Sequence, residues 1–234
     1  MWVSAVFAAV TAISGIEYQS DAVKAMQADA FGNPGLLWVD RGAALWKERC
    51  AQCHGEGDAM KGVAVRYPRY VPELRRVVDL EGRINACVTD RLHAPALAAE
   101  SGELLGLSAF VAHRSRGMQI VPDMSPEAGA AFERGRALYF ERQGQLNLAC
   151  TNCHDASPGR TLLAEKISQG QPADWPAYRL EWQSLGSLQR RLRACYYGVR
   201  ADMPAYGSDD LTALELYLAR RARGLATNPP GVRR

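Results

Sequence analysis

The chain of 234 residues is 47% hydrophobic and 23% charged, which is ordinary for a globular protein with a buried core and excludes a disordered chain. Its length fits one large domain or two small ones. The net charge of +3 indicates no nucleic-acid partner, and no run beyond the N-terminal segment approaches the roughly 18 apolar residues of a membrane span.

The chain begins with an apolar segment over residues 1–14, ending in small residues that suit cleavage after Ala12 or Ser14. This pattern is typical of a signal peptide and predicts export, in a bacterium to the periplasm. The basic residues that usually open a signal peptide are missing, so we expect a truncated signal segment. The alternative is a frayed apolar N-terminus.

Two helices are predicted in the first half of the chain. One runs through Arg41–Trp46 and leads into a Cys-x-x-Cys-His motif at Cys50–His54. The other is an amphipathic helix at the end of this half, where Leu104, Leu107 and Val111 recur at helical spacing. No comparable alternating run indicates a large sheet, so this half is predicted to be mostly helical.

A boundary is predicted near the middle of the chain, at Pro122, Ser125 and Pro126. Serine is favoured at the N-cap of a helix and proline in its first turn, so a new helix is predicted to begin here. The predicted domains are an N-terminal domain over residues 15–118, a linker over 119–125 and a C-terminal domain over 126–234.

The second half repeats the pattern of the first half in the same order. The matched segments are Arg41–Trp46 with Arg134–Tyr139, Cys50–His54 with Cys150–His154, Tyr67–Tyr70 with Trp175–Tyr178, Arg83–Cys87 with Arg191–Cys195, and Leu104–Gly117 with Leu211–Gly224. Self-similarity of this kind predicts two homologous domains in tandem.

Cys-x-x-Cys-His is the attachment signature of c-type haem, in which both thiols bind the haem vinyl groups and the histidine binds the iron. Zinc is the rival, but paired Cys-x-x-Cys motifs in zinc sites usually lie about 15 to 20 residues apart. We therefore predict a mostly α fold with two tandem cytochrome c-like domains related by internal duplication, holding two covalently bound haem c groups. The predicted attachment residues are Cys50, Cys53, Cys150 and Cys153, and the predicted iron ligands are His54 and His154.

The second iron ligand is predicted to be a cysteine in each half. Cys87 and Cys195 occupy matching places in the repeat, whereas Met203 of the second half is matched by Pro95, which cannot bind iron. A Cys87–Cys195 disulfide is the alternative for an exported protein, but equivalent positions around two separate centres are not expected to meet. Other first-half candidates are Met60, His93 and His113.

A thiolate ligand stabilises ferric iron, so both haems are predicted to have low potentials. Arg191 lies four residues before Cys195, one turn away on a helix, where its guanidinium could bind an oxyanion and favour the thiolate. The repeat leaves another role open, because Arg83 holds the same place beside Cys87 and could bind a haem propionate.

The sequence resembles the SoxA family, the dihaem subunits of the SoxAX cytochromes of the sulfur-oxidation system, over essentially the whole mature chain. The residues that carry the resemblance are Asn33–Gly35 with Trp38, Cys50–His54, Arg83–Cys87, Ser115–Gly117, Cys150–His154 and Gly186–Leu188.

The resemblance implies L-cysteine S-thiosulfotransferase activity. In this reaction thiosulfate is joined oxidatively to a cysteine of the carrier protein SoxYZ, and two electrons leave through haem. The implied iron ligands are His54 with Cys87 and His154 with Cys195, and the implied catalytic residues are Cys195, often found as a persulfide in the family, and Arg191. Implied partners are the monohaem cytochrome SoxX as a heterodimer subunit, SoxYZ, and a downstream electron-acceptor cytochrome.

Two alternatives to this activity stay open at the level of sequence. One is a thiosulfate dehydrogenase that forms tetrathionate and needs no carrier protein. The other is a plain dihaem electron carrier in which Met203 binds the second haem.

Overall fold

The structure, a computed structural model, describes residues 12–234. Of the predicted signal segment over residues 1–14, residues 1–11 lie outside the described residues. The last two residues of that segment contact the body of the protein: the backbone N–H of Ile13 donates to Oε1 of Gln169 at 2.8 Å, and the Ser14 hydroxyl donates to Oδ2 of Asp174 at 3.2 Å.

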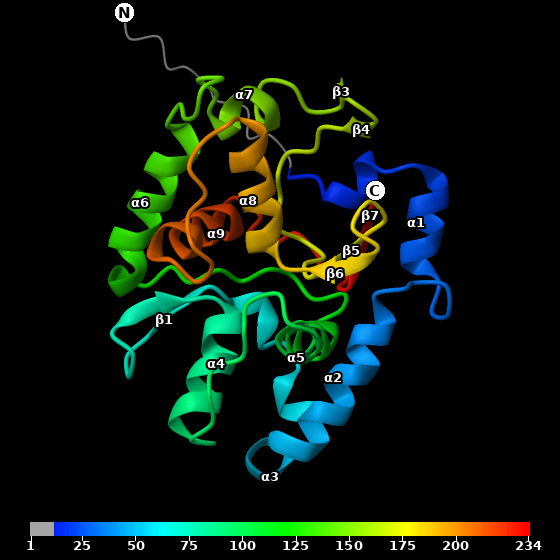
Figure 1. Cartoon of the computed structure of the whole chain (residues 1–234), viewed down its shortest axis with the longest axis vertical. Helices are drawn as coiled ribbons and strands as arrows, with labels where there is room; N and C mark the ends of the chain where they lie inside the picture. Colours follow the sequence, from blue (N-terminus) through cyan, green and yellow to red (C-terminus); the bar gives the residue numbers. More distant parts are fainter. Residues whose placement is uncertain (1–11) are drawn as a thin grey trace, which may run out of the picture.

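The described chain is mostly helical, with residues 36–113 at one end of the molecule and residues 126–221 at the other, whereas the helix at residues 21–28 lies with the second half (Figure 1). The helices are α1 (Asp21–Ala28), α2 (Leu36–Arg49), α3 (Ala51–His54), α4 (Leu80–Asp90), α5 (Gly102–His113), α6 (Gly129–Phe140), α7 (Cys150–His154), α8 (Leu188–Gly198) and α9 (Asp209–Arg221). Single 3-10 turns are η1 (Gly15–Tyr18), η2 (Asp58–Met60), η3 (Ala64–Arg66) and η4 (Pro126–Ala128).

Each strand has only two or three residues, which is why no alternating run shows in the sequence. The strands are β1 (Arg69–Val71), β2 (Arg76–Val78), β3 (Thr161–Leu162), β4 (Glu165–Lys166), β5 (Ala177–Arg179), β6 (Ser184–Gly186) and β7 (Gly231–Arg233). β1 pairs with β2 and β3 with β4, while the third sheet has the order β6-β5-β7 with β7 parallel to β5.

A close helix pair forms the centre of each half, α2 with α5 and α6 with α9. A side chain at Gly42 would collide with the carbonyl oxygen of Gly106, and one at Gly135 with that of Ala213. Gly42 and Gly135 are matched positions of the repeat. The absence of a Cβ at these positions lets the two helix backbones touch in both halves.

α5 and α9, the last helices of the two halves, each begin two residues before the predicted segments at Leu104–Gly117 and Leu211–Gly224. Each also ends a few residues before its predicted segment does. They are also buried almost all round, from Leu104 to Ala112 in α5 and from Leu211 to Ala219 in α9. The expectation of an amphipathic helix was therefore wrong. α5 is packed by α2, α4 and η3, and α9 by α6, α8 and β2, so neither helix keeps a solvent face.

At the middle boundary, Ser125 is the N-cap residue of η4 and Pro126 follows it in the first turn, as predicted. The two halves meet at the N-terminal ends of α4 and α8. Nε2 of Gln189 on α8 donates to Oδ2 of Asp79, the N-cap residue of α4, at 2.7 Å. The backbone N–H of Ser187, which caps α8, donates to Glu100 of the first half at 3.3 Å.

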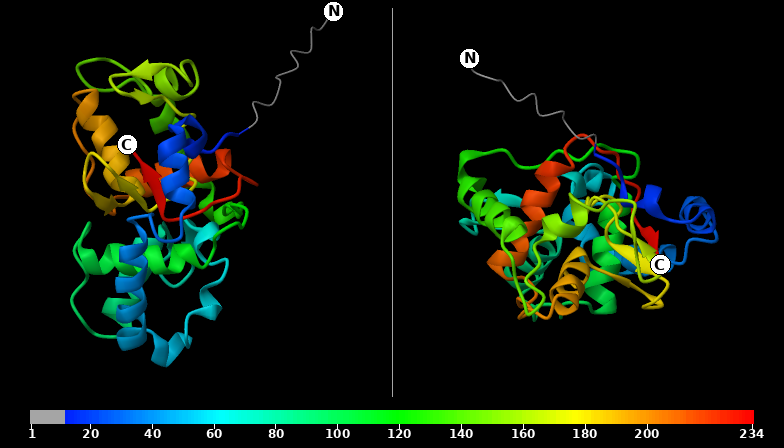
Figure 2. Two further views of the ribbon diagram at one scale, coloured as in Figure 1. Left: turned by 90° about the vertical axis from the view of Figure 1, so that its right-hand side faces the viewer. Right: turned by 90° about the horizontal axis from the view of Figure 1, so that it is seen from above.

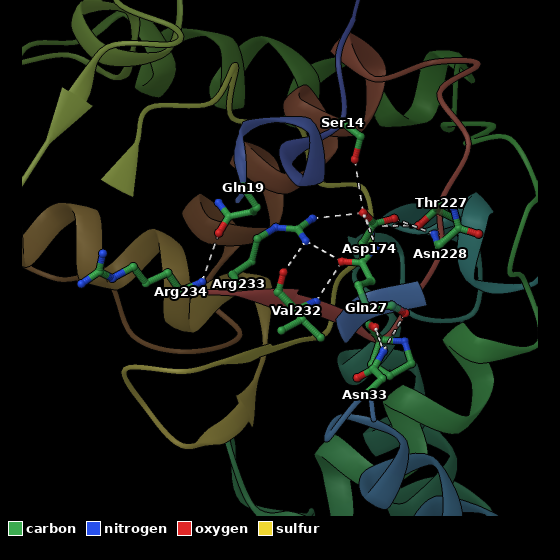
Figure 3. Close-up of polar contacts among 11 residues, drawn as sticks. Ser14, Gln19, Gln27, Asn33, Asp174, Thr227, Asn228, Val232, Arg233 and Arg234 are labelled. Carbon is green, nitrogen blue, oxygen red and sulfur yellow. Dashed lines mark hydrogen bonds and ion pairs between the residues drawn. The ribbon is translucent and has the colours of Figure 1, made fainter. Parts of the chain in front are cut away.

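The C-terminal segment closes the fold by returning to the N-terminal elements, and β7 lies beside α1 (Figure 2). Its centre is a buried ion pair between Arg233 and Asp174, joined at 3.0 Å (Figure 3). Arg233 also donates to Oε1 of Gln27 at 2.7 Å, and the Asn33 side chain donates to the carbonyl oxygen of Pro230 at 2.9 Å. The Asn33–Gly35 motif thus anchors α1 and α2 to the C-terminal strand.

Across residues 12–234, none of the helices has both the length and the apolar character needed to cross a bilayer.

Candidate haem and thiol site

Two short helices carry the chemistry of the second half. α7 holds the Cys150–His154 motif, and its first turn is closed by the side chain of Asn152, which accepts from the backbone N–H of Ala149 at 2.8 Å. α8 starts where the Ser187 hydroxyl accepts from the N–H of Arg190 at 3.0 Å. A capped helix start fixes the register of α8, so that Arg191 and Cys195 lie one turn apart on one face.

The half-buried thiol of Cys195 lies beside the second Cys-x-x-Cys-His motif, with the His154 side chain within hydrogen-bonding reach and Cys150 in electrostatic range. Burial opposes ionisation of Cys195, but the charge of Arg191 and the contact with His154 outweigh it, and the pKa of the thiol falls from 9.0 to about 7. By contrast, burial and the neighbouring Cys195 raise the pKa of Cys150 to about 11.

The ring of His154 is oriented by the segment that follows the β3–β4 hairpin. Nδ1 lies 2.7 Å from the carbonyl oxygen of Ser168, which leaves Nε2 as the nitrogen for the contact with Cys195 or for binding a metal. Gly170 has a φ of +69°, and a Cβ at this position would lie 3.0 Å from Cγ of His154. Glycine therefore suits this position both in conformation and in the space left beside the imidazole.

Arg191 is the cation that acts most strongly on Cys195. The neighbouring thiol raises the pKa of the Arg191 guanidinium, against the opposing effect of burial, and the carboxylates Glu165 and Glu181 add to the rise. No side-chain hydrogen bond of Arg191 occurs within residues 12–234, so its N–H donors are available to a ligand. A guanidinium with available donors beside a reactive thiol suits a bidentate oxyanion.

The first half gathers an equivalent but more open set. The Cys50–His54 motif begins at Cys50, the cap residue between α2 and α3, and continues through α3. The ring of Trp46 lies 5.6 Å from that of His54, which is exposed. Burial raises the pKa of the Cys50 thiol, and Cys87 on α4 lies close enough to add to this rise. The structure thus brings the third cysteine of each half, Cys87 or Cys195, toward the Cys-x-x-Cys-His motif of its own half.

The other predicted ligand candidates lie elsewhere. Met203 is 46% exposed, Met60 packs against the core of the first half, and His93 is exposed. The pKa of His113, at the end of α5, is lowered by burial and by Arg116 and Arg114. All six cysteines are free, so Cys87 and Cys195 are not bridged to each other.

The donor set in each half fits a covalently attached haem. Two thiols and an imidazole stand on one short helix, and a further thiol comes from the helix that follows the hairpin. Apolar side chains on the cysteine helices, Ile84 on α4 and Leu192 on α8, are only half-buried by protein and suit contact with a flat apolar macrocycle.

Sequence reasoning missed the residues that surround this thiol site. They are Ser168 and Gly170 beside His154, and the ion-paired group of Arg179, Glu165 and Glu181. The repeat alone could have drawn attention to this group, because Arg179 is a charged residue at a position where the first half has the apolar Val71. Glu165 lies on a hairpin for which the first half has no counterpart, so nothing in the sequence pattern pointed to it.

A mostly helical chain with a Cys-x-x-Cys-His helix in each half is a cytochrome of the c type. A family profile described as "SoxA/TsdA, cytochrome c domain" matches residues 40–120. The cytochrome c-like fold expected from the sequence is therefore confirmed.

The chain belongs to the SoxA family, as its sequence resemblance predicted. It is 35% identical over 230 residues to the L-cysteine S-thiosulfotransferase subunit SoxA of Pseudaminobacter salicylatoxidans, covering 94% of this chain and 80% of that protein. It is 36% identical over 228 residues to that of Rhodovulum sulfidophilum, covering 94% and 79%. The crystal structure of SoxXA from P. pantotrophus matches with a TM-score of 0.92 at 33% identity, over 95% of this chain and 87% of that chain.

Proposed function

We propose that this chain is the SoxA-type subunit of an L-cysteine S-thiosulfotransferase, which couples thiosulfate oxidatively to a cysteine of the carrier protein SoxYZ. In balanced form, a carrier thiol and thiosulfate give a cysteine S-thiosulfonate, one proton and two electrons. The relatives that share this name cover nearly the whole chain. The observation that carries the proposal is a thiol of lowered pKa, Cys195, that contacts His154 and lies within electrostatic range of Arg191, one turn away on α8.

In this proposal Arg191 binds the substrate anion and Cys195 forms the covalent intermediate. The guanidinium of Arg191 binds the sulfonate oxygens of thiosulfate, and the Cys195 thiolate bonds to the sulfane sulfur with loss of two electrons, giving an S-thiosulfonate on Cys195. A carrier thiolate then attacks the sulfane sulfur, takes over the thiosulfonate group and releases the Cys195 thiolate. Haem, when bound, would accept these two electrons one at a time and pass them on to the acceptor cytochrome.

We assign two haem c groups, one to each half, within domains at residues 15–118 and 126–234 joined by residues 119–125. The attachment residues are Cys50, Cys53, Cys150 and Cys153, and the iron ligands are His54 with Cys87 and His154 with Cys195. Matched helix pairs that close on Gly42 and Gly135 support an origin by internal duplication. Denatured protein from a host that attaches haem should keep two haems by mass spectrometry, and a mass increase for one haem or none would remove this assignment.

The partners we propose are SoxX as a heterodimer subunit, SoxYZ and thiosulfate as substrates, and an electron-acceptor cytochrome, all in the bacterial periplasm. The name of the matching crystal structure, SoxXA, supports the first of these. The alternative activity, a thiosulfate dehydrogenase that needs no carrier protein, would give tetrathionate as the product.

Product analysis tests this function. We expect the purified complex with SoxX to consume thiosulfate only when SoxYZ is present, and the carrier to gain the mass of an S-thiosulfonate. Formation of tetrathionate at the same rate without carrier would identify a thiosulfate dehydrogenase instead.

A further inference from the structure

Arg179 is a buried arginine at the end of the central strand of the β6-β5-β7 sheet, and its side chain is 4% exposed. Its Nη2 lies 2.7 Å from Oε1 of Glu165 and 2.6 Å from Oε1 of Glu181, and its Nε donates to Glu181 at 2.9 Å. The guanidinium also lies over the ring of Trp182, 5.0 Å from its centre. Both carboxylates are therefore held by one guanidinium.

The Arg179 group adjoins the start of α8, because the ring of Trp182 lies 5.0 Å from the guanidinium of Arg179 and 4.1 Å from that of Arg190, the neighbour of Arg191. Glu165 and Glu181 also lie within electrostatic range of Arg191, where they favour its charged form. A carboxylate that is free to reach a guanidinium forms a strong bidentate pair with it. Such a pair would occupy the N–H donors that an anionic substrate needs. Within the described chain, neither carboxylate makes a hydrogen bond to Arg191, and both bond to Arg179.

The fold itself does not require an arginine at this position. The matching residue in the first half is Val71 on β1, which is buried to the same degree, and it pairs with β2 in the same antiparallel way as β5 with β6. At this pair of matched positions, only the half that carries Arg191 and Cys195 has a buried charged side chain.

We propose that Arg179 is a positioning residue for the substrate anion: it holds Glu165 and Glu181 away from Arg191 and so leaves the Arg191 guanidinium open to the sulfonate group of thiosulfate. This inference rests on the proposed function, in which Arg191 binds that group. The proposed effect of Arg179 on the substrate anion runs through the two carboxylates, and its charge also lies within electrostatic range of the Cys195 thiol.

The test compares thiosulfate binding and turnover in the haem-loaded complex with SoxX. Arg179→Gln should raise KM and the thiosulfate Kd, the latter followed by haem absorbance, by about tenfold or more with little change in kcat, because the released carboxylates compete for Arg191. Adding Glu165→Gln and Glu181→Gln to this variant should restore Kd to within a few-fold of the original. Arg134→Gln is the matched control, since Arg134 also holds a carboxylate in two hydrogen bonds, to Asp210, away from the site.

Thermal unfolding of each variant shows whether it is folded. If Arg179→Gln does not fold, the double variant Glu165→Gln with Glu181→Gln in the presence of Arg179 replaces it, and it should bind thiosulfate several-fold more tightly. Unchanged Kd in Arg179→Gln, failure of the amide variants to restore it, or weaker binding in the double variant would overturn the role of Arg179. If Arg191→Lys also leaves Kd unchanged, Arg191 does not bind the sulfonate group and this inference loses its basis, whereas the proposed function itself is decided separately by the product analysis with SoxYZ.

Discussion

The guanidinium of Arg191 and the thiol of Cys195 lie one turn apart on α8, and each favours the charged form of the other. With its pKa lowered to about 7, the Cys195 thiol is substantially ionised at neutral pH, whereas an ordinary cysteine is mostly protonated. The His154 ring on the other side is held by the carbonyl of Ser168. Residue by residue, the second half thus holds a thiol of lowered pKa, a guanidinium and an oriented histidine together.

Replacing Cys195 by Met tests whether this cysteine does chemistry or only binds iron. Methionine keeps a sulfur ligand and should preserve the fold, but it cannot form an S-thiosulfonate, so we expect turnover with thiosulfate and SoxYZ to collapse. Steady-state rates measure this, with haem content as the control. Near-native turnover with both haems in place would mean that Cys195 is only an electronic ligand.

Replacing Arg191 by Lys keeps the charge but removes the planar fork that grips two oxygens at once. We expect kcat/KM for thiosulfate to fall by tenfold or more, which corresponds to at least about 1.4 kcal/mol of transition-state stabilisation. Steady-state rates measured over a range of thiosulfate concentrations give kcat/KM for the variant and the original protein. An unchanged kcat/KM would assign Arg191 to another role, such as binding a haem propionate.

The sequence predicted the residues of this site that carry a motif or a match in the repeat, namely the two Cys-x-x-Cys-His sets, Cys195 and Arg191. It could not predict Ser168, which acts through a backbone carbonyl that any residue possesses. It also could not predict Glu165, because only the folded hairpin brings this carboxylate to Arg179. Contacts made by backbone atoms, or by single side chains from distant segments, leave no periodic signal in a sequence.

At the scale of elements, β7 joins the two ends of the chain. All three of its residues are buried, and it pairs with β5, the strand before the β6 edge that leads into α8. The three residues of β7 are too few to predict a strand, whereas the helices at the ends of both halves were predicted from their apolar spacing. The full burial of these two helices, α5 and α9, was not predicted, because it depends on which other elements pack around each helix.

Replacing Arg233 by Met leaves Asp174 as a buried carboxylate without its cation. Breaking one partner of a buried ion pair costs about 3–5 kcal/mol, which for a chain of this length lowers Tm by roughly 10 °C. Thermal unfolding followed by circular dichroism measures the effect. Arg234→Met is the neighbouring control, because Arg234 makes exposed hydrogen bonds, and it should shift Tm by no more than about 2 °C.

At the scale of the whole molecule, the two halves dock through the N-terminal ends of the helices that carry Cys87 and Cys195. A pocket of about 120 Å³ between the halves is lined by Asp79 and Glu81 from the start of α4, by Ser108 from α5 and by Glu215 from α9. Ser108 and Glu215 occupy matched positions of the repeat. The repeat predicted two similar halves, but it could not predict that they meet here, since docking depends on positions where the halves differ.

Glu215 makes the stability of this docking depend on pH. Burial raises the pKa of its carboxyl well above the ordinary value of 4.5, and the nearby carboxyls of Asp79 and Glu81, whose own pKa values are raised mainly by burial, add to the rise. The folded chain therefore keeps a proton that the unfolded chain releases near pH 4.5. Stability contributed by this proton is present below that pH and is lost as the pH rises through the raised pKa of the folded state.

Replacing Glu215 by Gln removes this titration while it keeps the size and polarity of the side chain. We expect Tm to fall less steeply between pH 5 and 8 in Glu215→Gln than in the original protein, with the largest gain at the alkaline end, because no buried carboxylate then forms beside Asp79 and Glu81. Glu133→Gln on the exposed face of α6 is the control and should leave the pH profile of Tm unchanged. Parallel profiles for Glu215→Gln and the original protein would mean that Glu215 ionises without cost in the folded state, and that the halves stay docked around its charge.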